Sequence, residues 1–216
     1  MPYRRTENVT RRLAARHAAI IAAARDAASD GGMAAVQIAP VAQRAGIAAG
    51  TVYRYFPGKT DLIAALLSEI SEREIGALRR AAAVAPGPLS ALSAAIMTFA
   101  ARALRQRRLA WAAVAEPVDA ELDAARLDFR RALAAEFAQR IAAAAAAGYL
   151  PEQDATLTAA ALVGLLVEGL IGPLAPVATG REREVLQSLT LIALRAIGVA
   201  DARARGLVVQ TTVGDQ

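Results

Sequence analysis

Hydrophobic residues recur every three or four positions along most of the chain, which is the spacing of one face of an α-helix. Short stretches rich in glycine and proline, such as residues 85–88, separate the segments that have this spacing. The pattern predicts helices over residues 9–29, 59–83, 119–147, 154–172 and 181–198, and further helices that carry Ile96 and Trp111. We therefore expect an all-α protein of about nine helices, with residues 199–216 as a flexible tail.

Residues 37–56 are predicted to form two short helices joined by a tight turn. Ile38 and Val41 lie at helical spacing, and Gly46 stands where helices commonly end with a residue at positive φ. A second helix starts near Ala49. Two helices across a tight glycine turn form a helix-turn-helix, whose second helix can enter the major groove of DNA.

The second of these helices has two predicted faces. Val52 and Phe56 lie one turn apart and are expected to face the protein core. Thr51 and Tyr55 are also one turn apart, and we expect them to face outward. The aromatic and basic residues of the motif are therefore concentrated on the helix that would meet DNA.

The residue types between positions 45 and 59 resemble the DNA-binding signature of the tetracycline-repressor (TetR) family of bacterial regulators. The resembling residues are Ala45-Gly46-Ile47, Gly50-Thr51-Val52-Tyr53-Arg54-Tyr55-Phe56, Pro57 and Lys59. The resemblance implies a three-helix DNA-binding domain over residues 1–60. It also implies a helical domain over residues 61–198 that binds a small-molecule effector and forms a homodimer. Ala39, Ala48 and Ala49 depart from the family pattern, in which these positions often carry polar residues, so direct base readout is expected to be limited.

Charge is distributed unevenly along the chain. Residues 1–60 contain nine basic and three acidic residues, a net charge of +6, whereas the whole chain has a net charge of +5. The basic excess thus lies in the segment that holds the helix-turn-helix, as expected for contact with double-stranded DNA. An acidic protein partner is the weaker alternative.

Eight residues are candidate DNA contacts: Gln37, Arg44, Gly50, Thr51, Tyr53, Arg54, Tyr55 and Lys59. Hydroxyl groups of the threonine and the two tyrosines can bind phosphate oxygens, and the glycine lets the backbone approach a phosphate closely. Arg54 is the candidate base reader because a guanidinium can bond guanine O6 and N7 together. A further phosphate contact is the alternative role. Lys59, the only lysine in the chain, resembles the family's phosphate-contacting lysine.

Basic residues also precede or begin the first helix. Arg4, Arg5, Arg11 and Arg12 can lie along phosphates or reach into a minor groove. For the first two, a solvated tail is an equally good interpretation.

The candidate effector site consists of three aromatic residues and one carboxylate. Phe99, Trp111 and Phe129 lie on three predicted helices and can enclose one cavity. Glu168 lies among apolar residues, where a carboxylate needs a partner or a raised pKa, and it can orient a polar or cationic group on an apolar ligand. The alternatives are an ion pair with an arginine, or exposure at a dimer interface. The arginines at positions 102, 105, 107 and 108 are expected to form a solvated face.

The two predicted helices over residues 154–172 and 181–198 have more apolar surface than one neighbour can cover. In the resembling family the last two long helices pair with their copies as a four-helix bundle, so we expect a homodimer with Leu189 in its interface.

Several classes of function are disfavoured by composition. The chain has no cysteine and one histidine, His17, so we expect no metal site and no cofactor. Without a glycine-rich phosphate loop or an apolar carboxylate pair, we expect no catalytic residues and no enzyme activity. Residues 155–180 carry a single charge but are interrupted by glycine and proline, so a buried helix is preferred to a membrane span and a cytoplasmic location is expected.

The favoured function is a ligand-responsive transcriptional repressor that binds an inverted-repeat operator as a homodimer. The alternative is a DNA-binding regulator without a small-molecule effector.

Overall fold

The structure, a computed structural model, describes residues 7–117, 120–175 and 180–210. Within these ranges it contains ten α-helices, one short 3-10 helix and no β-strand, which confirms the all-α class. The elements are α1 (Glu7–Gly31), the 3-10 helix η1 (Met33–Ala35), α2 (Ile38–Arg44), α3 (Ala49–Tyr53), α4 (Lys59–Ala83), α5 (Pro88–Arg105), α6 (Arg107–Val114), α7 (Ala120–Ala146), α8 (Ala155–Leu174), α9 (Glu182–Ala196) and α10 (Asp201–Gln210).

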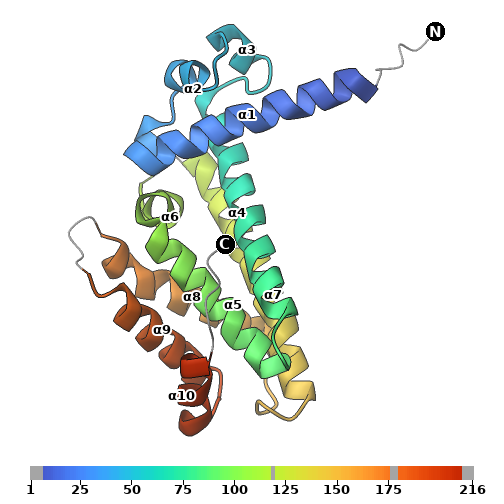
Figure 1. Cartoon of the computed structure of the whole chain (residues 1–216), viewed down its shortest axis with the longest axis vertical. Coiled ribbons are helices and arrows are strands. Elements are labelled where there is room, and N and C mark those ends of the chain that lie inside the picture. The colour runs from blue at the N-terminus through green and yellow to red at the C-terminus, as the bar shows by residue number, and fades with distance from the viewer. Residues whose placement is uncertain (1–6, 118–119, 176–179, 211–216) are drawn as a thin grey trace.

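The helices pack around two hydrophobic cores, and α4 contributes to both. Leu62 and Leu66, in its first half, are buried with residues of α1, η1, α2, α3 and α6. Leu78, in its second half, is buried with residues of α5, α7, α8, α9 and α10. Figure 1 shows α4 running from the end of the molecule that carries α2 and α3 towards the opposite end. The domain boundary predicted at residue 60 falls inside this continuous helix, and it stays a prediction.

The turn of the helix-turn-helix has the geometry that the sequence predicts. Gly46 has φ +65°, and its N–H donates to the carbonyl of Gln43 at 3.1 Å. The N–H of Ile47 donates to the carbonyl of Ala42 at 3.0 Å. These two bonds satisfy carbonyls that the end of α2 would otherwise leave open, and the left-handed residue between them favours glycine.

The two faces of the second helix agree only partly with the prediction. Val52 and Phe56 are 0% and 4% exposed, so their inward orientation is confirmed. Thr51 and Tyr55 are both half-buried rather than outward-facing, and Tyr55 packs against the first core. The reason is that α3 ends at Tyr53, and the chain turns there towards α1.

Three ion pairs connect α4 to three other helices. Glu69 accepts a hydrogen bond from Arg25 of α1 at 3.1 Å. Five residues further on, Glu74 pairs with Arg102 of α5 at 2.8 Å. Near the end of the helix, Arg79 donates to Glu136 of α7 at 2.8 Å, and this carboxylate is 3% exposed. Because each step of five residues turns the helix by about 140° net, the three pairs lie on different faces of α4 and fix its rotation as well as its position.

Within the described residues, α8 alone is long and apolar enough to cross a membrane by length and composition, and 39% of its most apolar window is buried. The side chain of Asp154 accepts hydrogen bonds from the backbone N–H groups of Thr156 and Leu157 at 2.9 and 3.0 Å. It is a normal N-cap for the helix. Leu166 and Leu170 face the second core, whereas small residues occupy much of the outer face.

Leu189 does not lie at an outer surface of α9, contrary to the sequence-based expectation. It is 7% exposed, and its methyl carbon would lie 2.6 Å from a Cβ placed on Gly169. The leucine therefore fills the contact between α8 and α9 within one chain. Ile192, which is 51% exposed, occupies the outer face instead.

The prediction that residues 199–216 form a flexible tail is wrong for residues 201–210. These residues form α10, with Ala204 and Leu207 buried against the second core. Asp201 accepts hydrogen bonds from Arg195 and, at 2.9 Å, from Arg205, and these bonds lower the pKa of its carboxyl group. The helix buries too few residues to leave a clear periodic pattern in the sequence. Residues 211–216 lie outside the described part of the chain.

We predict that Leu207→Ala lowers the free energy of unfolding by about 2 kcal/mol, because it leaves a cavity where α10 meets the core. Val209→Ala on the same helix is the control, since this valine is 81% exposed and its replacement should change stability by less than about 0.5 kcal/mol. Urea unfolding at one fixed protein concentration measures both. Equal stability of the two variants would mean that α10 does not contribute to the core.

Candidate functional site

The exposed residues of the helix-turn-helix lie at one end of the molecule, where α2 and α3 sit beside α1 (Figure 1). Tyr53 is 54% exposed, and Gly50, Arg54 and Lys59 are also exposed. The tyrosine and arginine are adjacent at the end of α3, and the lysine begins α4. These four residues are therefore accessible to a ligand as large as DNA.

Tyr55 is held differently from the other candidate DNA contacts. Its ring centre is 6.3 Å from that of His17 on α1, and the ring centre of Phe56 is 5.1 Å from the same histidine. The three rings join α1 to the end of the helix-turn-helix. Tyr55 thus packs within the domain. Its contact with DNA stays a prediction.

Gln37 and Arg44 are exposed but make contacts within the domain. The amide Nε2 of Gln37 donates to the carbonyl of Ala34 at 3.0 Å. Arg44 Nη2 lies 2.7 Å from a carboxylate oxygen of Asp30, and both side chains are largely exposed. An exposed pair of this kind contributes at most about 1 kcal/mol, so the arginine can exchange the aspartate for a phosphate at small cost.

Further basic residues lie on the part of α1 that projects beyond α2 and α3 (Figure 1). Arg11, Arg12 and Arg16 are exposed there. Arg4 and Arg5, the other members of the predicted basic arm, lie outside the described residues. The exposed arginines extend the positive surface of the helix-turn-helix along α1.

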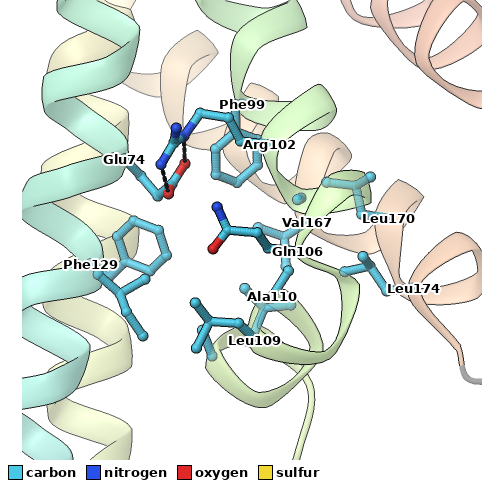
Figure 2. A pocket seen from close by; sticks show the side chains of 14 residues that line it. Glu74, Phe99, Arg102, Gln106, Leu109, Ala110, Phe129, Val167, Leu170 and Leu174 are labelled. Atoms are coloured by element: carbon cyan, nitrogen blue, oxygen red, sulfur yellow. Dashed lines mark hydrogen bonds and ion pairs between the residues drawn. The ribbon is translucent and has the colours of Figure 1, made fainter. Parts of the chain in front are cut away.

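A cavity lies between α4, α5, α6, α7 and α8 (Figure 2), and residues of both hydrophobic cores line it. Its volume is about 40 Å³. Phe99 and Phe129 line it together with aliphatic residues such as Leu109, Val167 and Leu170. Two of the four residues predicted for an effector site thus share one cavity.

The other two residues of the predicted effector site do not line this cavity. Trp111 lines a neighbouring depression with Arg108 and Glu116, on the other side of α6. Glu168 is exposed on the outer face of α8. Its apolar sequence neighbours include small residues that are themselves exposed, and this position agrees with the alternative of exposure at a dimer interface, which stays a prediction.

The polar residues of the cavity wall are Glu74, Arg102 and Gln106. Nε and Nη2 of the arginine donate to the two carboxylate oxygens of Glu74, each at 2.8 Å. The two side chains are 14% and 18% exposed, and the hydrogen bond to Glu74 is the main reason that the pKa of Arg102 is raised. Figure 2 shows the pair at one edge of the cavity, with the amide of Gln106 near its centre.

Sequence reasoning missed this ion pair although a signal was present. Glu74 lies four residues from both Ile70 and Leu78, on the buried stripe of α4. Arg102 lies three residues after Phe99 on the buried stripe of α5. Charged residues on two apolar stripes need partners when buried, so the expectation that Arg102 belongs to a solvated face is wrong.

Arg107 also differs from the expected solvated face. Its Nη2 donates to the carbonyls of Pro173 and Ala175 at 2.7 and 2.8 Å. These carbonyls belong to the end of α8, where the helix leaves its last acceptors unsatisfied. The arginine therefore attaches the beginning of α6 to the end of α8.

The opposite end of α6 is attached to the helix-turn-helix half of the chain by Glu116. One carboxylate oxygen accepts from the N–H of Met33 at 3.0 Å, and the other accepts from the N–H of Ala34 at 3.3 Å. Gly32 precedes these groups with φ 75° and ψ −173°, and a Cβ at that position would lie 2.4 Å from the carboxylate. Only glycine fits both this backbone conformation and the approach of Glu116.

Arg126 of α7 holds the segment that carries Glu116. Its Nη2 donates to the carbonyl of Ala112 at 2.9 Å and to that of Glu116 at 2.5 Å. Burial lowers the pKa of this arginine. Among the described residues, no group of three or more His, Cys, Asp or Glu side chains could hold a metal ion.

Residues 20–66 match the model of a protein family described as bacterial regulatory proteins, tetR family. The HTH-type transcriptional repressor KstR of Mycolicibacterium smegmatis is 44% identical over 66 residues, which make up 31% of this chain and 32% of that repressor. KstR of Rhodococcus jostii is 52% identical over 46 residues, 21% of this chain and 22% of the relative. The chain thus matches a third or less of the length of these relatives.

Solved structures resemble this one over most of its length. RolR in complex with resorcinol has a TM-score of 0.74 at 20% identity, covering 96% of this chain and 100% of RolR. FadR from Bacillus subtilis in complex with stearoyl-CoA has a TM-score of 0.65 at 20% identity, covering 81% of this chain and 97% of FadR. At 20% identity these structures show that the fold is similar, and the fold alone.

We predict that Gly32→Ala lowers the free energy of unfolding by about 2 kcal/mol or more, because it combines an unfavourable backbone conformation with displacement of Glu116. Gly46→Ala is the control: this glycine also has positive φ, but among the described residues nothing lies within 4 Å of an added Cβ. In a Glu116→Ala background the Gly32 substitution should cost less than in the parent, as measured by urea unfolding of all four combinations. Equal costs in both backgrounds would contradict the proposed close approach.

Proposed function

We propose that this chain, whose residues 20–66 match the tetR-family model, is a cytoplasmic transcriptional repressor. It binds an inverted-repeat operator as a homodimer and leaves the DNA when a small molecule occupies the cavity between α4 and α8. The observation that carries the proposal is the exposed helix-turn-helix with Tyr53, Arg54 and Lys59 at the basic end of the chain.

The cavity supports a link between ligand binding and DNA binding. The volume of the cavity is only about 40 Å³. A ligand that is larger than this cavity must displace the helices around it. Two of these helices, α4 and α6, also contact the DNA-binding half, α4 through the first core and α6 through the segment ending at Glu116. A ligand that favours a wider cavity therefore favours a different placement of the helix-turn-helix. The ligand-bound RolR and FadR structures support a small molecule as the effector.

The same small volume also favours the alternative function, a DNA-binding regulator without a small-molecule effector. In that case the cavity is a packing defect between α5 and α8, and repression depends on protein concentration or on a partner protein. Release of operator DNA by a cavity-binding compound would exclude this alternative.

DNA binding is tested by selecting bound sequences from a random duplex pool and then measuring the affinity of variants. Arg54→Ala is expected to cost about 1–3 kcal/mol and to relax base preference at one position in each half-site. Lys59→Ala should weaken binding to all sequences alike and reduce the dependence of affinity on salt by about one phosphate contact. Arg80→Ala, an exposed arginine on the far half of α4, is the control. If both variants bound the selected operator as the parent does, the proposed recognition surface would be wrong.

The homodimer is proposed to form through the outer faces of α8 and α9. Exposed apolar residues include Leu157 on α8 and Ile192 on α9, which are 68% and 51% exposed. The outer face of α8 also contains Ala161, Gly164 and Gly172. Residues with a small side chain or none let another helix approach closely. Such a dimer would place two recognition helices roughly 34 Å or more apart, as successive major grooves require.

Ile192→Glu is expected to convert the dimer to a monomer at micromolar concentration, because it places a second carboxylate, besides Glu168 on α8, in the proposed interface. Val84→Glu is the matched control, since this valine is 85% exposed in the connection between α4 and α5, away from the proposed interface. Sedimentation velocity measures the mass of each variant. A parent protein that is monomeric, or an Ile192 variant that stays dimeric, would overturn the proposed interface.

A further inference from the structure

The ion pair in the cavity wall indicates which chemical class of ligand the cavity accepts. We infer that Glu74, Arg102 and Gln106 form the polar end of the ligand site, and that this end selects uncharged molecules with an apolar body and a single hydroxyl group. The inference rests on the proposed function, because it concerns the effector site of the same cavity.

The pair of Glu74 and Arg102 carries no net charge. The guanidinium of Arg102 and the carboxylate of Glu74 are joined by two hydrogen bonds of 2.8 Å. Both are less than one fifth exposed, so water contributes little to their stabilisation. A ligand with its own charge would bring an unpaired charge to a neutral site, which is costly in partly buried surroundings.

A charged ligand that bonds the intact pair, such as a carboxylate on Nη1 of Arg102, brings the unpaired charge described above, and one that separates the pair also leaves a charge unpaired. A carboxylate that takes Arg102 leaves Glu74 without its partner, and an ammonium group that takes Glu74 leaves the arginine without its partner. Either outcome leaves one partly buried charge unpaired, and removing one member of a buried pair is strongly unfavourable. The ion pair therefore discriminates against both signs of charge.

A hydroxyl group can use the pair without separating it. Each carboxylate oxygen of Glu74 accepts one hydrogen bond from Arg102 and keeps capacity for another. Nη1 of Arg102 donates no hydrogen bond within the described residues, and the amide of Gln106 lies near the centre of the cavity (Figure 2). A hydroxyl can donate to the carboxylate and accept from a guanidinium or amide N–H at the same time.

The rest of the wall fits an apolar, partly aromatic body. Phe99 and Phe129 are 4% and 6% exposed, and Val167, Leu170 and Leu174 belong to the opposite side of the cavity (Figure 2). Burying an apolar body against these residues supplies most of the binding free energy. The hydroxyl group then sets the orientation of the ligand and adds the free energy of its hydrogen bonds to the pair.

The test uses four compounds that share one aromatic body: naphthalene, 2-naphthol, 2-naphthoic acid and 2-naphthylmethylamine. At about pH 7 the first two are uncharged, the acid is an anion and the amine is a cation. Isothermal titration calorimetry with the full-length protein should show that 2-naphthol binds at least about tenfold more tightly than each of the other three. The inference is overturned if the acid or the amine binds as tightly as the naphthol, or if naphthalene does.

Glu74→Gln tests the origin of the preference. It keeps the side-chain shape but leaves Arg102 as an unpaired cation, so 2-naphthoic acid should gain at least about tenfold in affinity relative to 2-naphthol. Glu72→Gln is the matched control, because this glutamate is exposed on the same helix outside the cavity. An unchanged order of affinities in Glu74→Gln would overturn the role assigned to the pair. The parent series alone decides the ligand class if this variant does not fold.

Failure of the proposed function gives a different result. If none of the four compounds binds the parent, this inference fails, whereas the proposed effector function is decided by whether any other small molecule that binds the cavity releases operator DNA. If the acid or the amine binds most tightly and releases operator DNA, the effector function stands and the inferred preference for a neutral hydroxyl compound is wrong. Fluorescence anisotropy of labelled operator DNA, titrated with each compound, distinguishes these outcomes.

Discussion

The structure depends on one continuous helix that belongs to two hydrophobic cores. The first half of α4 is buried with the helix-turn-helix and the second half with α5, α7 and α8. Its 25 residues extend about 37 Å at the rise of an α-helix. Ion pairs at Glu69, Glu74 and Arg79 attach it to α1, α5 and α7 in turn. Because a helix is stiff along its axis, a displacement at one core is passed to the other instead of being absorbed by a flexible linker.

Much of this architecture was predictable, because most helices bury a stripe of large apolar side chains. The sequence predicted a helix over residues 59–83, and α4 occupies those residues. The glycine turn of the helix-turn-helix was equally clear, since Gly46 needs a positive φ that other residues avoid. In contrast, α10 buries Ala204 and Leu207 among exposed polar residues, so its sequence resembles that of a solvated tail.

The cavity was less predictable, because periodicity identifies the faces of a helix but not their partners. On α8 the two faces differ in residue size and in one charge, Glu168, so the spacing of apolar residues alone does not distinguish the buried face from the exposed one. The pairing of Glu74 with Arg102 joins residues 28 positions apart, on two helices whose relative rotation the sequence does not specify. For the candidate DNA contacts the information is local, so residue types and order suffice to place Arg54 and Lys59 on an exposed surface.

The short helix α6 is fixed at both ends by polar contacts and touches the cavity only with apolar side chains in between. Arg107 attaches its beginning to the carbonyls of α8, and Glu116 attaches the segment after its end to the backbone of η1. Apolar contacts tolerate sliding, whereas hydrogen bonds to fixed backbone groups are lost after a small displacement. The helix α6 is therefore held as a rigid unit by hydrogen bonds at its two ends, and a small displacement breaks them. If a ligand widens the cavity as proposed, the attachment that breaks first would decide whether the helix-turn-helix half or only the end of α8 is loosened. Two side chains that need not touch the ligand would then set the sensitivity of the response.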